Sequence, residues 1–143
     1  MLVLGDVAEL FELGRASESA VSIVKNVQKF EWASMMLFNN EKCQMLTPDF
    51  IQDKYNNLFD FNWDKKAHGL PSEWNHCVGY DTPRTDAKLV HFTQGIPFHA
   101  ETEGTEYVDE WRQELEASVY SVSWQEMMGN SVHAKYVLAR NQT

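Results

Sequence analysis

A histidine followed by a sharp turn marks the segment of this sequence that is best suited to chemistry, KLVHFTQGIPFH at residues 88–99. The apolar residues before His91 predict a strand that ends at its imidazole, and Gly95 and Pro97 then turn the chain. An imidazole is a common metal ligand, and a glycine lets the backbone approach a phosphate closely. The same pattern fits an ordinary strand end with a turn behind it. The segment therefore predicts a metal or phosphate site or a purely structural turn, and His99 is expected to be a surface residue.

The composition is that of an acidic globular protein. The chain has 143 residues, of which 43% are hydrophobic and 23% charged, and this length suits a single domain over residues 1–143. The formal net charge is -9, which disfavours binding to nucleic acid and to anionic membrane surfaces. A nucleotide remains compatible with this charge, because a divalent cation can mediate the contact.

The cysteines and the first residues predict a reduced cytoplasmic protein. Cys43 and Cys77 lie far apart and form neither a disulfide framework nor a zinc-binding pattern. Asp6 interrupts the first apolar run, so the N-terminus is not typical of a signal peptide. No stretch approaches the roughly 18 apolar residues of a membrane helix, so no membrane insertion is expected.

The elements that would position His91 follow from apolar periodicity and from turn signals. Asp6 with Glu9, and Thr47 with Pro48, are typical of helix starts. The expected strands are residues 1–5, 20–25, 34–39 and 88–92. One helix is expected to begin after Asp6, and two more at residues 46–58 and 106–120. The remainder is expected to form a long irregular loop at 59–87, a helical turn at 123–129 and a tail at 130–143. This order predicts an α/β fold with a mixed sheet, although an α+β arrangement is also compatible.

Three phrases in one order resemble a known family. MLVLGDVAELF, LPSEWN and VHFTQGIPF, within residues 1–99, resemble the second half of a GT-A-type nucleotide-diphospho-sugar transferase, and most closely the glycosyltransferase family 8 type. The resemblance implies a mixed-sheet GT-A-like fold of which only the C-terminal half is present, without the nucleotide-binding half. It also implies transfer of a sugar from a nucleotide-diphospho-sugar donor to an acceptor hydroxyl.

The resemblance implies roles for three residues. His91 matches the family's metal-ligating histidine, with Mn²⁺ or Mg²⁺ as the cofactor, and Gly95 matches a phosphate-loop glycine. Glu31 stands where the family binds the donor sugar, so the resemblance implies that it contacts the sugar or the acceptor. The family places an Asp-x-Asp metal motif directly before the segment that corresponds to MLVLGD, and no Asp-x-Asp occurs in this sequence. We therefore expect the isolated chain to be inactive and to bind metal weakly.

The departures from the family keep a second interpretation open. Ile96 stands where the family has a phosphate-neutralising lysine, and Phe98 replaces a tryptophan. The alternative is a non-catalytic module for protein interaction or oligomerisation, which would bind a partner or a second copy through an exposed sheet edge and the aromatic loop. The donor sugar, the acceptor and the stereochemical outcome stay open in either case.

Overall fold

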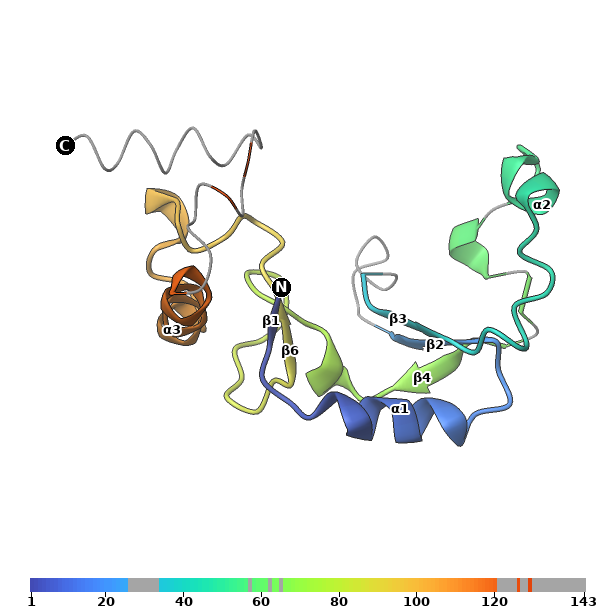
Figure 1. Ribbon diagram of the computed structural model, residues 1–143, viewed down its shortest axis with the longest axis horizontal. Helices are drawn as coiled ribbons and strands as arrows, with labels where there is room; N and C mark the ends of the chain where they lie inside the picture. Colours follow the sequence, from blue (N-terminus) through green and yellow to red (C-terminus); the bar gives the residue numbers. More distant parts are fainter. Residues whose placement is uncertain are drawn as a thin grey trace. The chain divides into compact units, whose positions relative to one another are not determined.

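The structure is a computed structural model that describes residues 1–25, 34–56, 58–61, 63–64, 66–120, 126 and 129. The chain divides into two compact units, Met1–His91 and Phe92–Thr143. Figure 1 shows short strands and helices joined by extended connections. Compact units of this kind can belong to one domain, so the single domain inferred from the length stays a prediction.

The first unit holds all the described strands. They are β1 (Leu2–Val3), β2 (Val21–Val24), β3 (Met36–Phe38), β4 (His68–Leu70), β5 (His76–Cys77) and β6 (Leu89–His91). Its helices are α1 (Val7–Arg15), α2 (Pro48–Gln52) and the 3₁₀ turns η1 (Leu58–Asp60) and η2 (Ser72–Trp74). The second unit contains the 3₁₀ turn η3 (Ala100–Thr102) and α3 (Val108–Val119).

Both sheets of the first unit are mixed, which confirms the predicted α/β class with mixed pairing. One sheet has the order β1-β6-β5, with β1 antiparallel and β5 parallel to β6. The other has the order β3-β2-β4, with β3 antiparallel and β4 parallel to β2.

The two predicted helix starts are confirmed, although neither helix matches the prediction fully. The Asp6 carboxylate accepts from the Ala8 N–H at 2.9 Å and caps α1, but the Glu9 carboxylate binds Lys88 Nζ at 2.5 Å in place of a capping-box contact. In α2, the Thr47 hydroxyl accepts from a backbone N–H at 3.2 Å. That helix ends at Gln52, well before residue 58, because Asp53 turns to an extended conformation and its side chain accepts a backbone N–H two residues on.

The expectation of an irregular loop at residues 59–87 is wrong. This stretch contains β4 and β5, each of which pairs in parallel with a strand distant in the sequence. The strands are two or three residues long, so they carry almost no alternating pattern of their own. Their stability comes from the partner strands, which a reading of local periodicity does not detect.

The core of the first unit lies on both faces of β2, whose four residues are all buried. On one face, Val24 packs with Leu10 of α1 and with Trp74, and their cluster also contains Met35, Leu70 and Leu89. On the other face, Val21 and Ile23 pack with Phe61 and Trp63. The strand predicted at residues 20–25 is therefore confirmed, with bounds Val21–Val24.

Strand β3 has a nearly all-apolar sequence, which is typical of a strand covered on both faces, yet two of its side chains are exposed. Met36 is 41% exposed and Phe38 is 42% exposed. The strand forms an edge of its sheet, because among the described residues it pairs with β2 alone. Its apolar sequence therefore leaves hydrophobic side chains in solvent.

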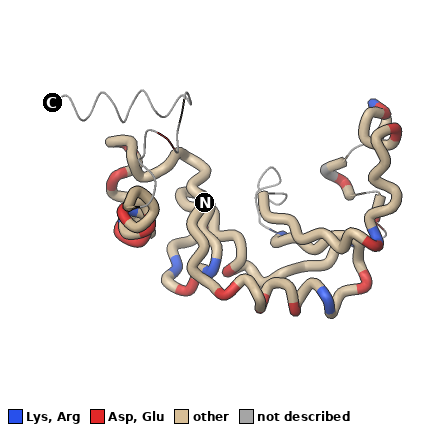
Figure 2. Tube along the Cα trace, viewed as in Figure 1, with Lys and Arg blue, Asp and Glu red and all other residues tan. Residues whose placement is uncertain are grey.

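The second unit is built around α3, which confirms the helix predicted at residues 106–120. Tyr107 precedes the helix in a left-handed conformation, with φ 59°, and Trp111 and Leu115 are half-buried. Figure 2 shows that Asp and Glu residues gather along this helix. The predicted tail at 130–143 lies outside the described residues. Within the described ranges, no helix is long and apolar enough to cross a membrane.

Candidate functional site

His91 lies at the carboxyl end of β6, as the sequence predicts. Parallel pairing sets Cys77 of β5 opposite His91, and the Val78 N–H donates to the His91 carbonyl oxygen at 3.0 Å. The side chain of His91 is half-buried. The imidazole therefore belongs to a strand end whose backbone is fixed by its neighbour.

Strand β1 runs along the other side of β6, in the opposite direction (Figure 1). The pairs are Leu2 with Val90 and Val3 with Leu89. Because antiparallel pairs change by one residue in each chain, the next pair in this register is Met1 with His91. Residues placed before Met1 would therefore be directed to the carboxyl end of β6, where the imidazole lies.

Gly95 belongs to the second unit and confirms the predicted turn. Its φ is +118°, a backbone conformation that side-chain-bearing residues rarely adopt. The turn is tied locally, since the Gly95 N–H donates to the Phe92 carbonyl at 3.4 Å and the Thr102 hydroxyl contacts the Ile96 carbonyl at 2.7 Å. Its phosphate-binding role stays a prediction.

The predicted sugar or acceptor contact, Glu31, lies outside the described residues. Among the residues that the structure describes, no three His, Cys, Asp or Glu side chains are grouped so that they could hold a metal ion. A hard divalent cation beside His91 would need several oxygen ligands in addition to the imidazole.

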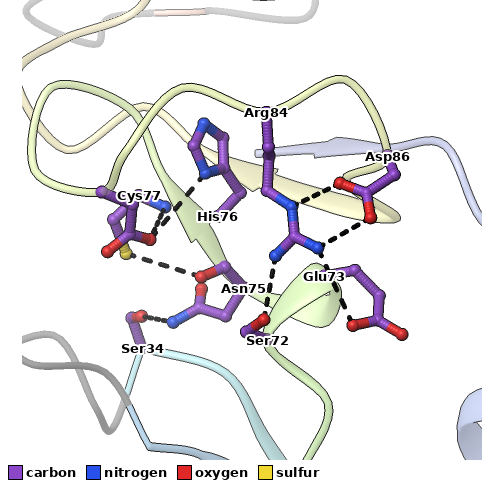
Figure 3. A network of polar contacts seen from close by, with 9 residues as sticks. Ser34, Ser72, Glu73, Asn75, His76, Cys77, Arg84 and Asp86 are labelled. Atoms are coloured by element: carbon purple, nitrogen blue, oxygen red, sulfur yellow. Dashed lines mark hydrogen bonds and ion pairs between the residues drawn. The ribbon is translucent and has the colours of Figure 1, made fainter.

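The sequence analysis missed a polar network around β5 (Figure 3). It contains Ser34, Ser72, Glu73, Asn75, His76, Cys77, Asp81, Arg84 and Asp86. Arg84 donates to both carboxylate oxygens of Asp86, at 2.6 and 2.9 Å, and to the Ser72 hydroxyl at 3.0 Å. This side chain ties the segment after β5 to η2. The Arg-x-Asp spacing at residues 84–86 is the sequence signal that could have indicated this polar network.

Arg84 also sets the electrostatics of the exposed end of the network. Its hydrogen bonds to Asp86 favour the ionised carboxylate and hold the pKa of Asp86 below its ordinary value. Asp86 is 72% exposed on its side chain, so this pair is screened by water.

The buried end of the network is structural. Asn75, His76 and Cys77 are all at most 1% exposed. The Asp81 carboxylate accepts from the Cys77 N–H at 2.8 Å and lies 3.9 Å from His76 Nδ1. Neighbouring strand residues point to opposite faces, so His76 and Cys77 do not form a nucleophile and base pair. We conclude that the network holds β5 in place beside β6.

A pocket of about 310 Å³ lies beside α1 and the β2–β3 pair, and the sequence analysis missed it as well. It is lined by Phe11, Gly14, Arg15, Ser19, Ser22, Leu37, Phe38, Asn39, Asn40 and Glu41. The pattern that could have indicated it is FNNE at residues 38–41, where an exposed aromatic residue meets polar side chains at a strand end.

The comparisons with known proteins find a distant relative. The chain is 30% identical over 95 residues to Protein CDI from Arabidopsis thaliana, and the match covers 59% of this chain. The same match covers 37% of that protein, whose name states no activity. No family model matches the sequence, and no solved structure matches it.

Proposed function

We propose that this chain is part of a GT-A-like glycosyltransferase that transfers a sugar from a nucleotide-diphospho-sugar, and that His91 is one ligand of its divalent metal site. The observation that carries the proposal is the pairing register of β1 with β6, in which Met1 would be the next residue to lie opposite His91. In the family that the sequence resembles, the Asp-x-Asp motif directly precedes the segment that corresponds to Met1–Asp6. The register supports a site in which such carboxylates and His91 lie at the same end of β6.

The residues present fit one part of such a site. A half-buried imidazole at a fixed strand end is a suitable ligand for Mn²⁺ or Mg²⁺, and the preceding carboxylates would supply hard oxygen ligands. A divalent ion held there would neutralise the negative charge of a diphosphate leaving group. Ile96 adds no charge for the phosphates, so this chain would depend on the metal more than the family pattern does.

The test is Mn²⁺ binding by calorimetry to the chain with Asp-Ala-Asp placed directly before Met1. A matched chain with Asn-Ala-Asn has the same length without the carboxylates. We expect millimolar binding to the unextended chain and affinity at least about tenfold higher with Asp-Ala-Asp, because two carboxylates join the imidazole. His91→Ala should abolish this gain.

His68 provides the matched histidine control, because it is exposed on β4 in the other sheet. His68→Ala should leave metal binding unchanged. Equal affinity for the Asp-Ala-Asp and Asn-Ala-Asn chains, or equal effects of the two histidine variants, would contradict the proposal. We also expect no sugar transfer or nucleotide-sugar hydrolysis by the unextended chain, measured as release of nucleoside diphosphate.

A second candidate function, a module for self-association, is supported by the exposed edge strands. Val3 of β1 is 50% exposed, and Met36 of β3 is 41% exposed. Each strand has one paired side among the described residues, and unpaired edges with apolar side chains favour pairing with another strand.

Light scattering tests this second candidate. A dimer should form at micromolar concentrations, and Val3→Lys with Met36→Lys should convert it to a monomer by placing charges on both edges. Tyr55→Lys is the matched control, because Tyr55 is 81% exposed and lies outside the strands. A monomer at all concentrations, or a dimer unaffected by the edge lysines, would rule the module out.

A further inference from the structure

The pocket beside α1 combines aromatic surface with polar groups. Phe11 of α1 is 50% exposed and Phe38 of β3 is 42% exposed, and both line the pocket. The ring of Phe38 stacks on Trp63, with ring centroids 6.1 Å apart and the planes 11° from parallel. Trp63 therefore supports Phe38 from the protein interior, while part of the Phe38 side chain remains exposed to a ligand.

The polar wall is fixed through its backbone. The Asn39 N–H donates to the Ala20 carbonyl at 2.9 Å, and the Asn39 carbonyl accepts from the Lys42 N–H at 2.9 Å. The side chains of Asn39 and Asn40 make no hydrogen bond within the part of the chain that the structure describes. Two amides, each with a donor and an acceptor, are thus held at the pocket and are available to a ligand.

The charges at the pocket disfavour an anionic ligand. Arg15 is paired with Glu12, and nearby Lys42 is paired with Glu18 at 3.2 Å. Glu41 adds a carboxylate to the lining, and the whole chain carries a net charge of -9. A phosphate or carboxylate ligand would meet this negative field, whereas a neutral ligand with hydroxyl groups would not.

We propose that this pocket binds a neutral sugar ring, with Phe11 and Phe38 against its C–H face and with Asn39, Asn40 and Glu41 bonded to its hydroxyls. A pyranose combines an apolar face with a rim of donors and acceptors, which is the pattern that the lining offers. The volume of about 310 Å³ lies at the low end for ligand pockets and suits one or two rings. The site is distinct from His91 and does not depend on a metal.

The test uses the full chain with maltose, cellobiose and lactose as probes, in the presence of EDTA. Saturation-transfer NMR should detect at least one of them, with a millimolar dissociation constant by calorimetry, as expected for a small ligand. Phe11→Ala and Asn40→Ala should each weaken binding by about two- to tenfold. Both side chains are on the surface, so circular dichroism should show that each variant remains folded.

Two controls separate this site from the metal site. Tyr55→Ala removes an exposed aromatic ring outside the pocket, and His91→Ala removes the proposed metal ligand, so neither should change sugar binding. Failure of all three disaccharides to bind would overturn the proposal. Binding that survives Phe11→Ala and Asn40→Ala, or tighter binding of glucose 6-phosphate than of the neutral sugars, would also overturn it. None of these results bears on the metal proposal.

Discussion

Gly5 lies where β1 passes into α1, and a side chain there should break the fit between these elements and β6. A Cβ atom at Gly5 would lie 2.6 Å from Lys88 Cβ, 2.9 Å from Lys88 Cγ and 3.1 Å from Trp74 Cη2. Lys88 Cβ cannot move away alone, because the Lys88 carbonyl accepts the N–H groups of both Leu4 and Gly5, at 2.8 and 2.9 Å. Trp74 is fully buried. Gly5→Ala must therefore shift backbone.

The expected magnitude combines two opposing terms. Replacing glycine by alanine stabilises a compatible site by about 0.4–1 kcal/mol, because the unfolded chain loses freedom. Overpacking of a tight site costs about 1–3 kcal/mol. We expect Gly5→Ala to lower the free energy of unfolding by about 1–2 kcal/mol, since the steric term dominates.

Gly69 in β4 is the matched control, because a Cβ atom there would meet nothing within 4 Å. Gly69→Ala should leave the free energy of unfolding unchanged or raise it by up to about 1 kcal/mol. Urea unfolding followed by tryptophan fluorescence measures both variants. Equal free energies of unfolding for the two variants would refute the steric argument and with it the close packing of Gly5 against Lys88.

Three further predictions concern other parts of the chain. Gly95→Ala should destabilise its turn by about 1 kcal/mol in urea unfolding, because its φ is +118°. Burial raises the pKa of the Cys43 thiol, and Cys77 is fully buried, so both should react slowly with a disulfide reagent at neutral pH until the chain is unfolded in urea. Arg84→Ala should raise the pKa of Asp86 in an NMR titration. Because Arg84 lowers the pKa of Asp86 in the folded chain, the pair stabilises the fold at neutral pH, and this stabilisation is lost as the pH falls through the folded pKa of Asp86.

The sequence predicts the elements whose signals are local. The β-branched run at Val21–Val24 forms a fully buried strand, and Asp6 and Thr47 cap the helices that follow them. The strand ending at His91 is also found as predicted. Each of these depends on residues within a few positions of one another, which is the range that periodicity and capping patterns cover.

The sequence does not predict elements that depend on distant partners. His68 of β4 pairs with Ser22, and His76 of β5 pairs with Val90, across long separations in the sequence. Nothing in the short runs around these residues alternates enough to indicate a strand. The exposure of Met36 could not be predicted either, because an apolar run looks the same whether its sheet face is covered or open.

The hydrogen bonds of β6 and of the residue before it fix the backbone at His91. On one side, the Gly5 N–H bonds to the Lys88 carbonyl, and on the other the Lys88 N–H donates to the Glu73 carbonyl at 2.7 Å. At the far end, the Val78 N–H donates to the His91 carbonyl. The strand is thus fixed on both sides over its length, so the backbone of His91 has little freedom. A metal ligand benefits from such positioning, because the entropy of ordering it is lost on folding and not on binding. Gly5→Ala should therefore weaken Mn²⁺ binding by the chain extended with Asp-Ala-Asp, whereas Gly69→Ala should not, even under conditions where both variants are fully folded.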